Sequence, residues 1–363
     1  MDKNNYCVIM AGGIGARFWP MSRTEKPKQF IDILGTGETL IQQTFRRFLD
    51  VCPPENIYVV TSDRYRDLVK DQLPLLADHQ ILCEPSRRNT GPCIAYANHK
   101  IARQNPDATI VVAPSDHIIL REDIFKSVIV GALDAARKNP WLITLGITPS
   151  RPDTGYGYIQ FNEELVCPSN PKVRKVKTFT EKPNHELATT FLASGDFLWN
   201  AGIFIWSLRA INEAFQTHLP EVNDIFERGA NVYNTPGEAD FIEQAYAVCR
   251  NISIDYGIME KAPNVYVLMS DFGWSDLGTW GSLYSIRPKD GNGNAIMGNN
   301  VMTYDTTSCI INMPKDKVAV VQGLDDFIVA EDDNILLICK KKDEQQLRDI
   351  VNDVKIKKGD QFV

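Results

Sequence analysis

A glycine-rich loop near the start of the chain, with two basic residues close behind it, has the composition of a phosphate-binding site. An apolar run, residues 6–10, leads into the loop, whose charged and glycine positions are Gly12, Gly13, Gly15, Arg17 and Lys28. Glycines allow positive φ angles and let backbone amides approach an anion closely. The two basic side chains add positive charge. The segment therefore predicts a loop that binds phosphate groups.

Two well-known phosphate motifs do not fit this loop, and one structural alternative stays open. A dinucleotide-binding turn requires a third glycine where this chain has Phe18. A P-loop requires the string G-x-x-x-x-G-K-[ST], which does not occur in the chain. A glycine-rich turn from a strand to a helix, with exposed basic residues and no ligand, explains the segment equally well when it is taken alone.

Two aspartates far apart in the sequence are candidates for binding a divalent cation. Asp116 follows an apolar run, residues 109–113, and Asp276 lies in a tight turn after a similar run, residues 265–269. A protein of net charge −7 that binds an anionic nucleotide needs a cation, and Mg²⁺ commonly takes one or two carboxylates together with phosphate oxygens. We therefore expect Mg²⁺ at Asp116 and Asp276. Each aspartate could instead cap a following helix.

A third group of polar residues suits a sugar phosphate. Glu181 and Lys182 follow a strand-like run, residues 173–180, and offer a carboxylate for hydroxyl groups beside an ammonium for a phosphate. Asn200 stands among small residues in an apolar strand, which leaves room for a ligand. The alternatives are a solvated surface ion pair at Glu181 and Lys182, and a β-bulge at Asn200.

Length and composition limit the class of protein. A chain of 363 residues exceeds one hydrophobic core, so we expect two domains. No apolar run approaches the ~20 residues of a membrane span, and the N-terminus has no secretory leader, so we expect a cytoplasmic protein without a membrane partner. The charge of −7 argues against a nucleic-acid partner. The eight cysteines form no C-x-x-C pair and are expected to be reduced core thiols.

Strand-like and helix-like segments alternate through the first part of the chain. Strands are expected at 6–10, 56–61, 80–83, 108–113 and 142–147, with helices at 39–49, 64–73, 91–104 and 124–138. Such alternation predicts an α/β fold with a Rossmann-like, mostly parallel mixed sheet and helices on both faces. Ligands bind at the carboxyl ends of the strands in such sheets. After a β-rich region from Tyr156, the turn-rich loop 287–294 suggests domains at 1–288 and 289–363.

The ordered set of motifs resembles the mannose-1-phosphate guanylyltransferases, also called GDP-mannose pyrophosphorylases. The resemblance extends over about residues 5–340 and rests on the glycine loop with Phe-Trp-Pro-Met-Ser-Arg (through Arg23), Pro27-Lys28-Gln29-Phe30, Glu84-Pro85, Arg88-Asn89-Thr90-Gly91-Pro92, Pro114-Ser115-Asp116-His117, Tyr156-Gly157-Tyr158-Ile159, Glu181-Lys182-Pro183, Asn200-Ala201-Gly202-Ile203-Phe204, Ser253-Ile254-Asp255-Tyr256 and Trp274-Ser275-Asp276-Leu277-Gly278-Thr279-Trp280. Single motifs are weak, whereas their order is specific to this family.

The resemblance implies a role for each motif. It makes Arg17 and Lys28 catalytic, with Arg17 on the triphosphate and Lys28 on the reacting phosphate. Nucleotide binding is implied for Gly12, Gly13, Gly15, Glu84, Asn89, Thr90, Gly91 and Ser115. Sugar-phosphate binding is implied for Gly157, Glu181, Lys182, Asn200 and Asp255, and Mg²⁺ or another divalent cation is implied at Asp116 and Asp276.

The resemblance also implies the fold and the reaction. The fold would be that of the nucleotide-diphospho-sugar transferases, followed by a small domain like a left-handed β-helix that often contributes to homodimers. The chain ends soon after this region, so phosphomannose isomerase activity is not expected. The implied reaction joins mannose 1-phosphate and GTP to give GDP-mannose and pyrophosphate. A pyrophosphorylase for another sugar or nucleotide, or a non-catalytic nucleotide-sugar sensor, stays open as an alternative.

Overall fold

The computed structural model describes residues 2–13, 15–167 and 170–363 and divides into two compact units. The first unit comprises Met1–Gly12, Gln42–Ser115 and Ile119–Trp274. The second unit comprises Gly13–Ile41, Asp116–Ile118 and Ser275–Val363. The short strands β5 (Ile118–Ile119) and β11 (Trp274–Ser275) lie where the chain passes from one unit to the other.

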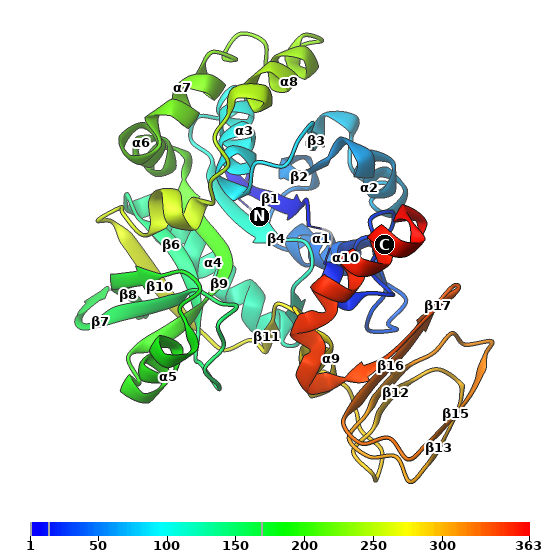
Figure 1. Cartoon of the computed structure of the whole chain (residues 1–363). Coiled ribbons are helices and arrows are strands. Elements are labelled where there is room, and N and C mark those ends of the chain that lie inside the picture. The colour runs from blue at the N-terminus through cyan, green and yellow to red at the C-terminus, as the bar shows by residue number, and fades with distance from the viewer. Residues whose placement is uncertain (1, 14, 168–169) are drawn as a thin grey trace. The chain divides into compact units, whose positions relative to one another are not determined.

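The first unit is built on a nine-stranded sheet with the order β3-β2-β1-β4-β9-β6-β10-β8-β7 (Figure 1). Its strands are β1 (Asn5–Ala11), β2 (Ile57–Ser62), β3 (Ile81–Glu84), β4 (Thr109–Pro114), β6 (Leu142–Ile147), β7 (Tyr158–Cys167), β8 (Asn170–Thr180), β9 (Phe197–Ser207) and β10 (Val265–Ser270). β1 pairs in parallel with β2 and β4, and β6 with β10, whereas β9 runs antiparallel to β4 and β6. The predicted mixed sheet is therefore confirmed.

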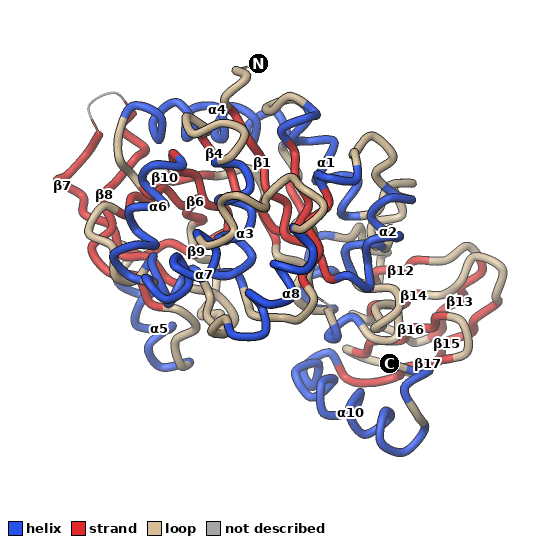
Figure 2. The backbone as a smooth tube through the Cα atoms, turned by 90° about the horizontal axis from the view of Figure 1, so that it is seen from above, coloured by secondary structure: helices blue, strands red, loops and turns tan. Residues whose placement is uncertain are grey.

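Helices lie on both sides of this sheet, as Figure 2 shows. They are α1 (Leu40–Leu49), α2 (Arg66–Gln72), α3 (Thr90–Ala102), α4 (Glu122–Lys138), α5 (His185–Ser194), α6 (Leu208–His218), α7 (Pro220–Glu227) and α8 (Glu238–Val248). Neighbouring residues of a strand point to opposite faces, which decides what each helix packs against. Val8 joins the core cluster beneath α3 and α6–α8, whereas Phe48 of α1 and Phe125 of α4 pack edge to face, with ring centroids 5.9 Å apart.

The expected strands and helices are present, with differences of a few residues at their ends. Helix α7 was not expected, because it is only eight residues long and follows α6 almost directly, with Pro220 in its first turn. The β-bulge considered for the Asn200 segment is present: between Thr144 and Gly146, β6 loses register with β9, and Gly202 has φ 67°.

The second unit ends in a stack of short parallel strands, which confirms the β-helix-like region. Two sheets, β12-β14-β16-β17 and β13-β15, are formed by β12 (Ala295–Met297), β13 (Asn300–Tyr304), β14 (Ile310–Asn312), β15 (Val318–Gln322), β16 (Phe327–Asp332) and β17 (Ile335–Lys340). Of the strand pairs described in these two sheets, only β16–β17 is antiparallel. Ile311, Val321 and Val329 form an inner core, and Ile310 lies in a second core with residues of α9 (Trp280–Ile286) and α10 (Leu347–Lys358).

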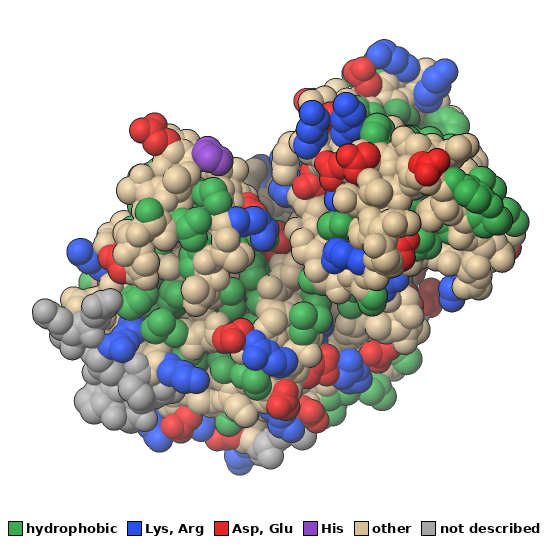
Figure 3. All heavy atoms as spheres, turned by 90° about the horizontal axis from the view of Figure 1, so that it is seen from below, with side chains coloured by type: hydrophobic (Ala, Val, Ile, Leu, Met, Phe, Trp, Pro, Cys, Tyr) green, Lys and Arg blue, Asp and Glu red, His purple; other side chains and the backbone are tan. Residues whose placement is uncertain are grey.

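The charged side chains at the surface and the state of the cysteines both agree with what the amino-acid composition predicts. Acidic and basic side chains are interspersed on the face that Figure 3 shows. All seven cysteines whose side chains are described are free thiols, and five of them are buried, as expected for reduced core residues. Among the described residues, no helix combines the length and the apolar character needed to cross a membrane.

Candidate active site

In the second unit, the glycine loop lies against the stem of Lys28. Gly15 has φ 72°, and a Cβ atom at this position would lie 2.7 Å from the Cβ of Lys28, so only glycine fits here without strain. The side-chain amide of Gln29 donates a hydrogen bond of 2.9 Å to the carbonyl of Gly13. Loop and lysine therefore form one packed motif, as their proximity in sequence suggested.

The Lys28 ammonium is buried, and three oxygen atoms lie within hydrogen-bonding distance of it. Its Nζ lies 2.8 Å from Oδ2 of Asp116 and donates hydrogen bonds of 2.8 Å and 3.0 Å to the carbonyls of Asp276 and Leu277. The Lys28 side chain is only 5% exposed. Asp116 and the Asp276 turn, 160 positions apart in sequence, are thus brought together around one cationic atom.

Neither aspartate caps a helix. Arg121 is the residue that precedes α4, and Thr279 caps α9, so the capping alternatives for Asp116 and Asp276 are wrong. Burial opposes ionisation of Asp116, but the positive charges of Lys28 and His117 outweigh it and hold the pKa of this carboxyl below its usual value. Asp116 is therefore an anion at neutral pH.

The Asp276 turn presents its backbone oxygens in a strained conformation. Leu277 has φ 46°, which is uncommon for a residue with a branched side chain, and its side chain is fully buried. Oδ1 of Asp276 accepts a hydrogen bond of 3.0 Å from the amide of Gly278. One carboxylate oxygen and two carbonyl oxygens around a cation are hard donors of the kind that Mg²⁺ prefers. Whether both carboxylates bind a metal stays a prediction.

Arg17 differs from Lys28 in its surroundings. It lies in the 3₁₀ turn Ala16–Phe18, directly after the glycine loop, and is partly exposed. Among the described residues, none forms a hydrogen bond or an ion pair with its side chain. The guanidinium can therefore meet a ligand without first breaking an interaction within the described protein.

In the first unit, Glu84 lies beside the start of the glycine loop. A Cβ atom at Gly12 would be 3.5 Å from Oε2 of Glu84. Tyr246 donates a hydrogen bond of 2.9 Å to Oε1 of the same carboxyl. Burial raises the pKa of Glu84 to about 7, although the Tyr246 hydrogen bond and the charge of Arg87 act in the opposite direction. Glu84 can therefore carry a proton near neutral pH. Nothing in the sequence pointed to Tyr246.

The Asn89-Thr90-Gly91 turn begins α3 but does not offer free amides to a phosphate. Asn89, with φ 68°, accepts a hydrogen bond from the amide of Thr90 with its own side chain. The Gly91 amide donates to the carbonyl of Ile252 at 2.9 Å, and Pro92 has no N–H group. None of the first three residues of the helix therefore has a free backbone N–H group: two amides already donate hydrogen bonds, and the proline has none. This arrangement argues against contact between the backbone amides of the turn and the nucleotide phosphates.

Thr90 and Gly91 also fix the chain segment that precedes Asp255. The Oγ1 atom of Thr90 accepts a hydrogen bond of 2.9 Å from the amide of Ile254. A Cβ atom at Gly91 would lie 2.7 Å from the carbonyl oxygen of Ile252, so glycine is needed for this close approach. Ser115, at the end of β4, is buried and donates its amide to the carbonyl of Met10 at 3.0 Å.

The five predicted sugar-phosphate residues come together in the first unit. A Cβ atom at Gly157 would lie 2.4 Å from Oε2 of Glu181 and 3.3 Å from the Cβ of Asn200. Lys182 forms an ion pair with Glu181, and Asn200 donates a hydrogen bond of 3.0 Å to Asp255. The Lys182 side chain is 57% exposed but that of Glu181 only 9%, so the pair is not the fully solvated one that we considered.

Asp255 is a partly buried carboxyl beside another acidic group, Glu181. Burial and the negative charge of Glu181 raise its pKa to about 7, although Lys182 and Asn200 lower it. Two partners in this cluster were not predicted. Thr144 donates a hydrogen bond of 2.8 Å to Oδ1 of Asn200, and Glu260 accepts one of 3.2 Å from the amide of Glu181. Thr144 looked like an ordinary residue of a buried strand.

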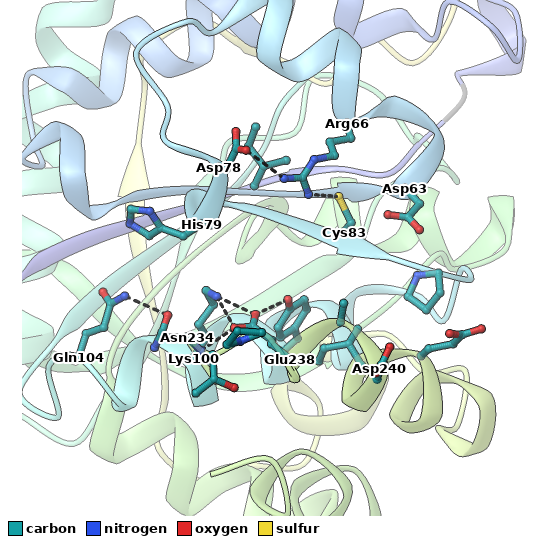
Figure 4. A pocket seen from close by; sticks show the side chains of 18 residues that line it. Asp63, Arg66, Asp78, His79, Cys83, Lys100, Gln104, Asn234, Glu238 and Asp240 are labelled. Atoms are coloured by element: carbon teal, nitrogen blue, oxygen red, sulfur yellow. Dashed lines mark hydrogen bonds and ion pairs between the residues drawn. The ribbon is translucent and has the colours of Figure 1, made fainter. Parts of the chain in front are cut away.

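A separate cavity of about 910 Å³ lies along the edge strand β3 and contains none of the predicted residues (Figure 4). Arg66 and Asp78 form an ion pair on one wall, and Lys100 and Glu238 form a buried pair on the other, with 2.6 Å between Nζ and Oε2. Tyr96 donates a further hydrogen bond to Glu238. These groups satisfy one another and explain the local structure without a ligand.

Comparison with known proteins identifies the family. Residues 6–293 match the model of the nucleotidyl transferase family, and residues 298–354 match that of the MannoseP isomerase/GMP-like beta-helix domain. A mannose-1-phosphate guanylyltransferase of Escherichia coli K12 is 33% identical over 96% of this chain and 73% of its own length. The chain belongs to the mannose-1-phosphate guanylyltransferase family of nucleotidyl transferases.

Two further proteins are similar to this chain over nearly its whole length. The alginate biosynthesis protein AlgA of Pseudomonas aeruginosa is 34% identical over 96% of this chain and 71% of its own length. The crystal structure of mannose-1-phosphate geranyltransferase from Thermus thermophilus has a TM-score of 0.86 at 28% identity and covers 97% of this chain and 99% of that one. The nucleotidyl transferase domain and the β-helix-like region are thus shared with these relatives over nearly the whole chain.

Proposed function

We propose that the protein transfers the guanylyl group of GTP to mannose 1-phosphate, which gives GDP-mannose and pyrophosphate. The observation that carries this proposal is the match over 96% of the chain to a relative named mannose-1-phosphate guanylyltransferase. The grouping of Gly157, Glu181, Lys182, Asn200 and Asp255 in one cluster supports it, because these are the residues that the family resemblance assigns to the sugar phosphate.

The reaction needs positioning and charge neutralisation more than proton transfer. An oxygen of the sugar phosphate forms a bond to the α-phosphorus of GTP, the bond from that phosphorus to the bridging oxygen breaks, and pyrophosphate leaves. The attacking oxygen is already ionised, so no general base is required. Arg17, which is not engaged within the described protein, would bind the triphosphate, and fixed charges of this kind stabilise a transition state strongly.

The cluster at Glu181, Asn200 and Asp255 would orient the mannose. Oδ1 of Asn200 accepts hydrogen bonds from Thr144 and from the amide of Gly202, whereas its Nδ2 donates to Asp255. This fixes which end of the amide is oxygen, so Asn200 offers its remaining N–H as a donor. Glu181 offers carboxylate oxygens to sugar hydroxyls, and Lys182 brings a positive charge for the phosphate.

We further propose that Asp116 and Asp276 hold Mg²⁺ or another divalent cation. The oxygens that surround the Lys28 ammonium fit such an ion chemically. When bound, the cation would neutralise negative charge on the nucleotide phosphates. We also propose a cytoplasmic homodimer, since exposed Met302, Val318 and Val320 give the β-helix-like region an apolar face suited to a second copy.

A substrate panel tests the proposed reaction. Pyrophosphate release is measured with each pairing of four nucleoside triphosphates and several hexose 1-phosphates, with and without Mg²⁺. We expect GTP with mannose 1-phosphate to give the highest kcat/KM and turnover to depend on a divalent cation. Faster reaction of thymidine or adenosine triphosphate with glucose 1-phosphate would contradict the guanylyl assignment. No pyrophosphate release from any pairing would favour a non-catalytic sensor.

A further inference from the structure

The three N–H donors of the Lys28 ammonium are matched by three acceptor oxygens within the second unit. A lysine ammonium carries three N–H donors and no acceptor. Three oxygens lie within hydrogen-bonding distance of this one: the Asp116 carboxylate at 2.8 Å, the Asp276 carbonyl at 2.8 Å and the Leu277 carbonyl at 3.0 Å. The Lys28 side chain is 5% exposed, so the ammonium is almost entirely surrounded by protein.

This arrangement separates Lys28 from Arg17 in function. A phosphate that arrives at the glycine loop meets an Arg17 side chain with no partner among the described residues. To reach Lys28, it must displace at least one of three short contacts to a buried charge. In the arrangement observed here, Lys28 therefore neutralises Asp116 and orders the Asp276 turn, and it does not present a donor to the nucleotide.

We propose that Lys28 is an internal counter-cation that competes with the divalent ion for the Asp116 carboxylate and the carbonyls of Asp276 and Leu277. Entry of the divalent ion displaces the ammonium, and only the displaced ammonium can contact a phosphate. The inference rests on the proposed function in one respect, namely that these oxygens form the cation site. Lys28 thus occupies two positions in succession: among the oxygens of the cation site before the divalent ion enters, and within reach of a phosphate afterwards.

The backbone conformation at Leu277 supports a role for Lys28 in keeping the oxygens of the cation site in position. Leu277 keeps a left-handed conformation at φ 46°, which turns two successive carbonyls toward the same ammonium. Such conformations cost energy and persist only where the surroundings hold them. Without a cation, the Asp116 carboxylate and these carbonyls would repel one another. Lys28 stabilises the oxygens in the positions that a cation requires.

Binding of Mn²⁺ to the free protein tests the competition, with no substrate present. The variant Lys28→Met keeps an apolar stem of similar length and removes the competing charge. If the ammonium occupies the site nine-tenths of the time, its removal tightens Mn²⁺ binding about tenfold, since apparent affinity scales with the fraction of competent sites. Titration followed by the electron paramagnetic resonance signal of free Mn²⁺ measures this. Turnover should nevertheless fall, because the displaced ammonium is lost.

Lys26→Met is the matched control, because Lys26 is exposed and lies two positions away in the same segment. It should leave Mn²⁺ affinity unchanged. Unchanged or weaker Mn²⁺ binding by Lys28→Met would overturn the proposal. The titration contains neither nucleotide nor sugar, so a wrong substrate assignment would appear only in the pyrophosphate assay and would not affect this result.

A measurement on the unmodified protein covers the case in which Lys28→Met does not fold. Acylation of lysine amines, followed by mass spectrometry of the peptides, reports how accessible each ammonium is. Saturating Mn²⁺ should raise the labelling rate of Lys28 at least severalfold and leave that of Lys26 unchanged. Labelling of Lys28 that is unchanged or slowed by Mn²⁺ would show that the ammonium and the ion do not compete, and the proposal would be rejected.

Discussion

Asp116 in the second unit and Asp255 in the first are both partly buried, yet the pKa values of their carboxyl groups are shifted in opposite directions. Lys28 and His117 hold the pKa of Asp116 low despite burial, whereas burial and Glu181 raise the pKa of Asp255 to about 7. One carboxyl is matched by an internal cation, and the other faces a second carboxyl. The chemistry of an aspartate in this protein is thus decided by the charge of its neighbours.

The two perturbations have opposite consequences for folding. A lowered pKa means that Asp116 stabilises the folded protein above the ordinary aspartate pKa, and that this stabilisation is lost as the pH falls. A raised pKa means that the folded protein binds a proton at Asp255 that the unfolded chain has already released. Stability from this group is therefore present at low pH and is lost as the pH rises from about 4 to about 7.

Removal of the charge on Asp116 should have the largest effect. Asp116→Asn leaves the buried Lys28 ammonium without its counter-charge, and an uncompensated buried charge costs about 3 kcal/mol of stability. We expect a folded protein with a lower Tm and a kcat reduced about 10²–10³-fold, the range for loss of one preorganised electrostatic contact. Thermal unfolding and pyrophosphate release measure both effects. Asp71→Asn, on the exposed side of α2, is the control, and equal losses in the two variants would contradict the expectation.

Asp255→Asn should alter the pH dependence of stability. The wild-type Tm should fall between pH 5 and pH 8 in part because Asp255 loses its proton, and the variant lacks this contribution. Relative to wild type, we therefore expect Asp255→Asn to be more stable at pH 8 than at pH 5. Asp224→Asn, an exposed position in α7, should show no such trend. A difference in Tm that is the same at both pH values would mean that Asp255 titrates normally.

Thr144→Val should weaken binding of the sugar phosphate. The change keeps the side-chain shape and removes the donor that fixes the Asn200 amide. Loss of one buried hydrogen bond, about 1 kcal/mol, corresponds to roughly a fivefold increase in KM for mannose 1-phosphate. The KM for GTP should change little. Thr144→Ser, which retains the hydroxyl, should restore most of the affinity, and failure to do so would indicate a packing effect.

Lys182→Met should have the smallest effect on folding. Its ammonium is more than half exposed, and pairs of this kind contribute about 0.5 kcal/mol or less to stability. We expect a Tm close to that of wild type, together with a higher KM for mannose 1-phosphate because a positive charge is lost. Lys172→Met, on β8, is a control for general charge effects. A large fall in Tm would show that the pair with Glu181 is structural.

Much of the fold could be predicted because its patterns are local. Residues 109–113 are almost entirely β-branched or apolar, which is typical of a strand that is buried on both faces of a sheet. The acceptors of Lys28 could not be predicted, since two of them are backbone carbonyls about 250 positions away, and a carbonyl has no sequence signature. Thr144 and Tyr246 were missed for a related reason: they resemble core residues until their partners are known. The raised pKa of Asp255 likewise depends on Glu181, which only the fold brings near.

The hydrogen bond from the Ile254 amide to Thr90 joins the two predicted substrate-binding groups of the first unit. Thr90 belongs to the predicted nucleotide site, and the residue after Ile254 is Asp255, which holds the Asn200 amide. A nucleotide bound at Thr90 would therefore also restrict the segment that we propose orients the sugar. In kinetic terms, the substrates should bind synergistically, so that each lowers the dissociation constant of the other by the same factor. The short 252–255 segment would thereby couple the binding of the two substrates.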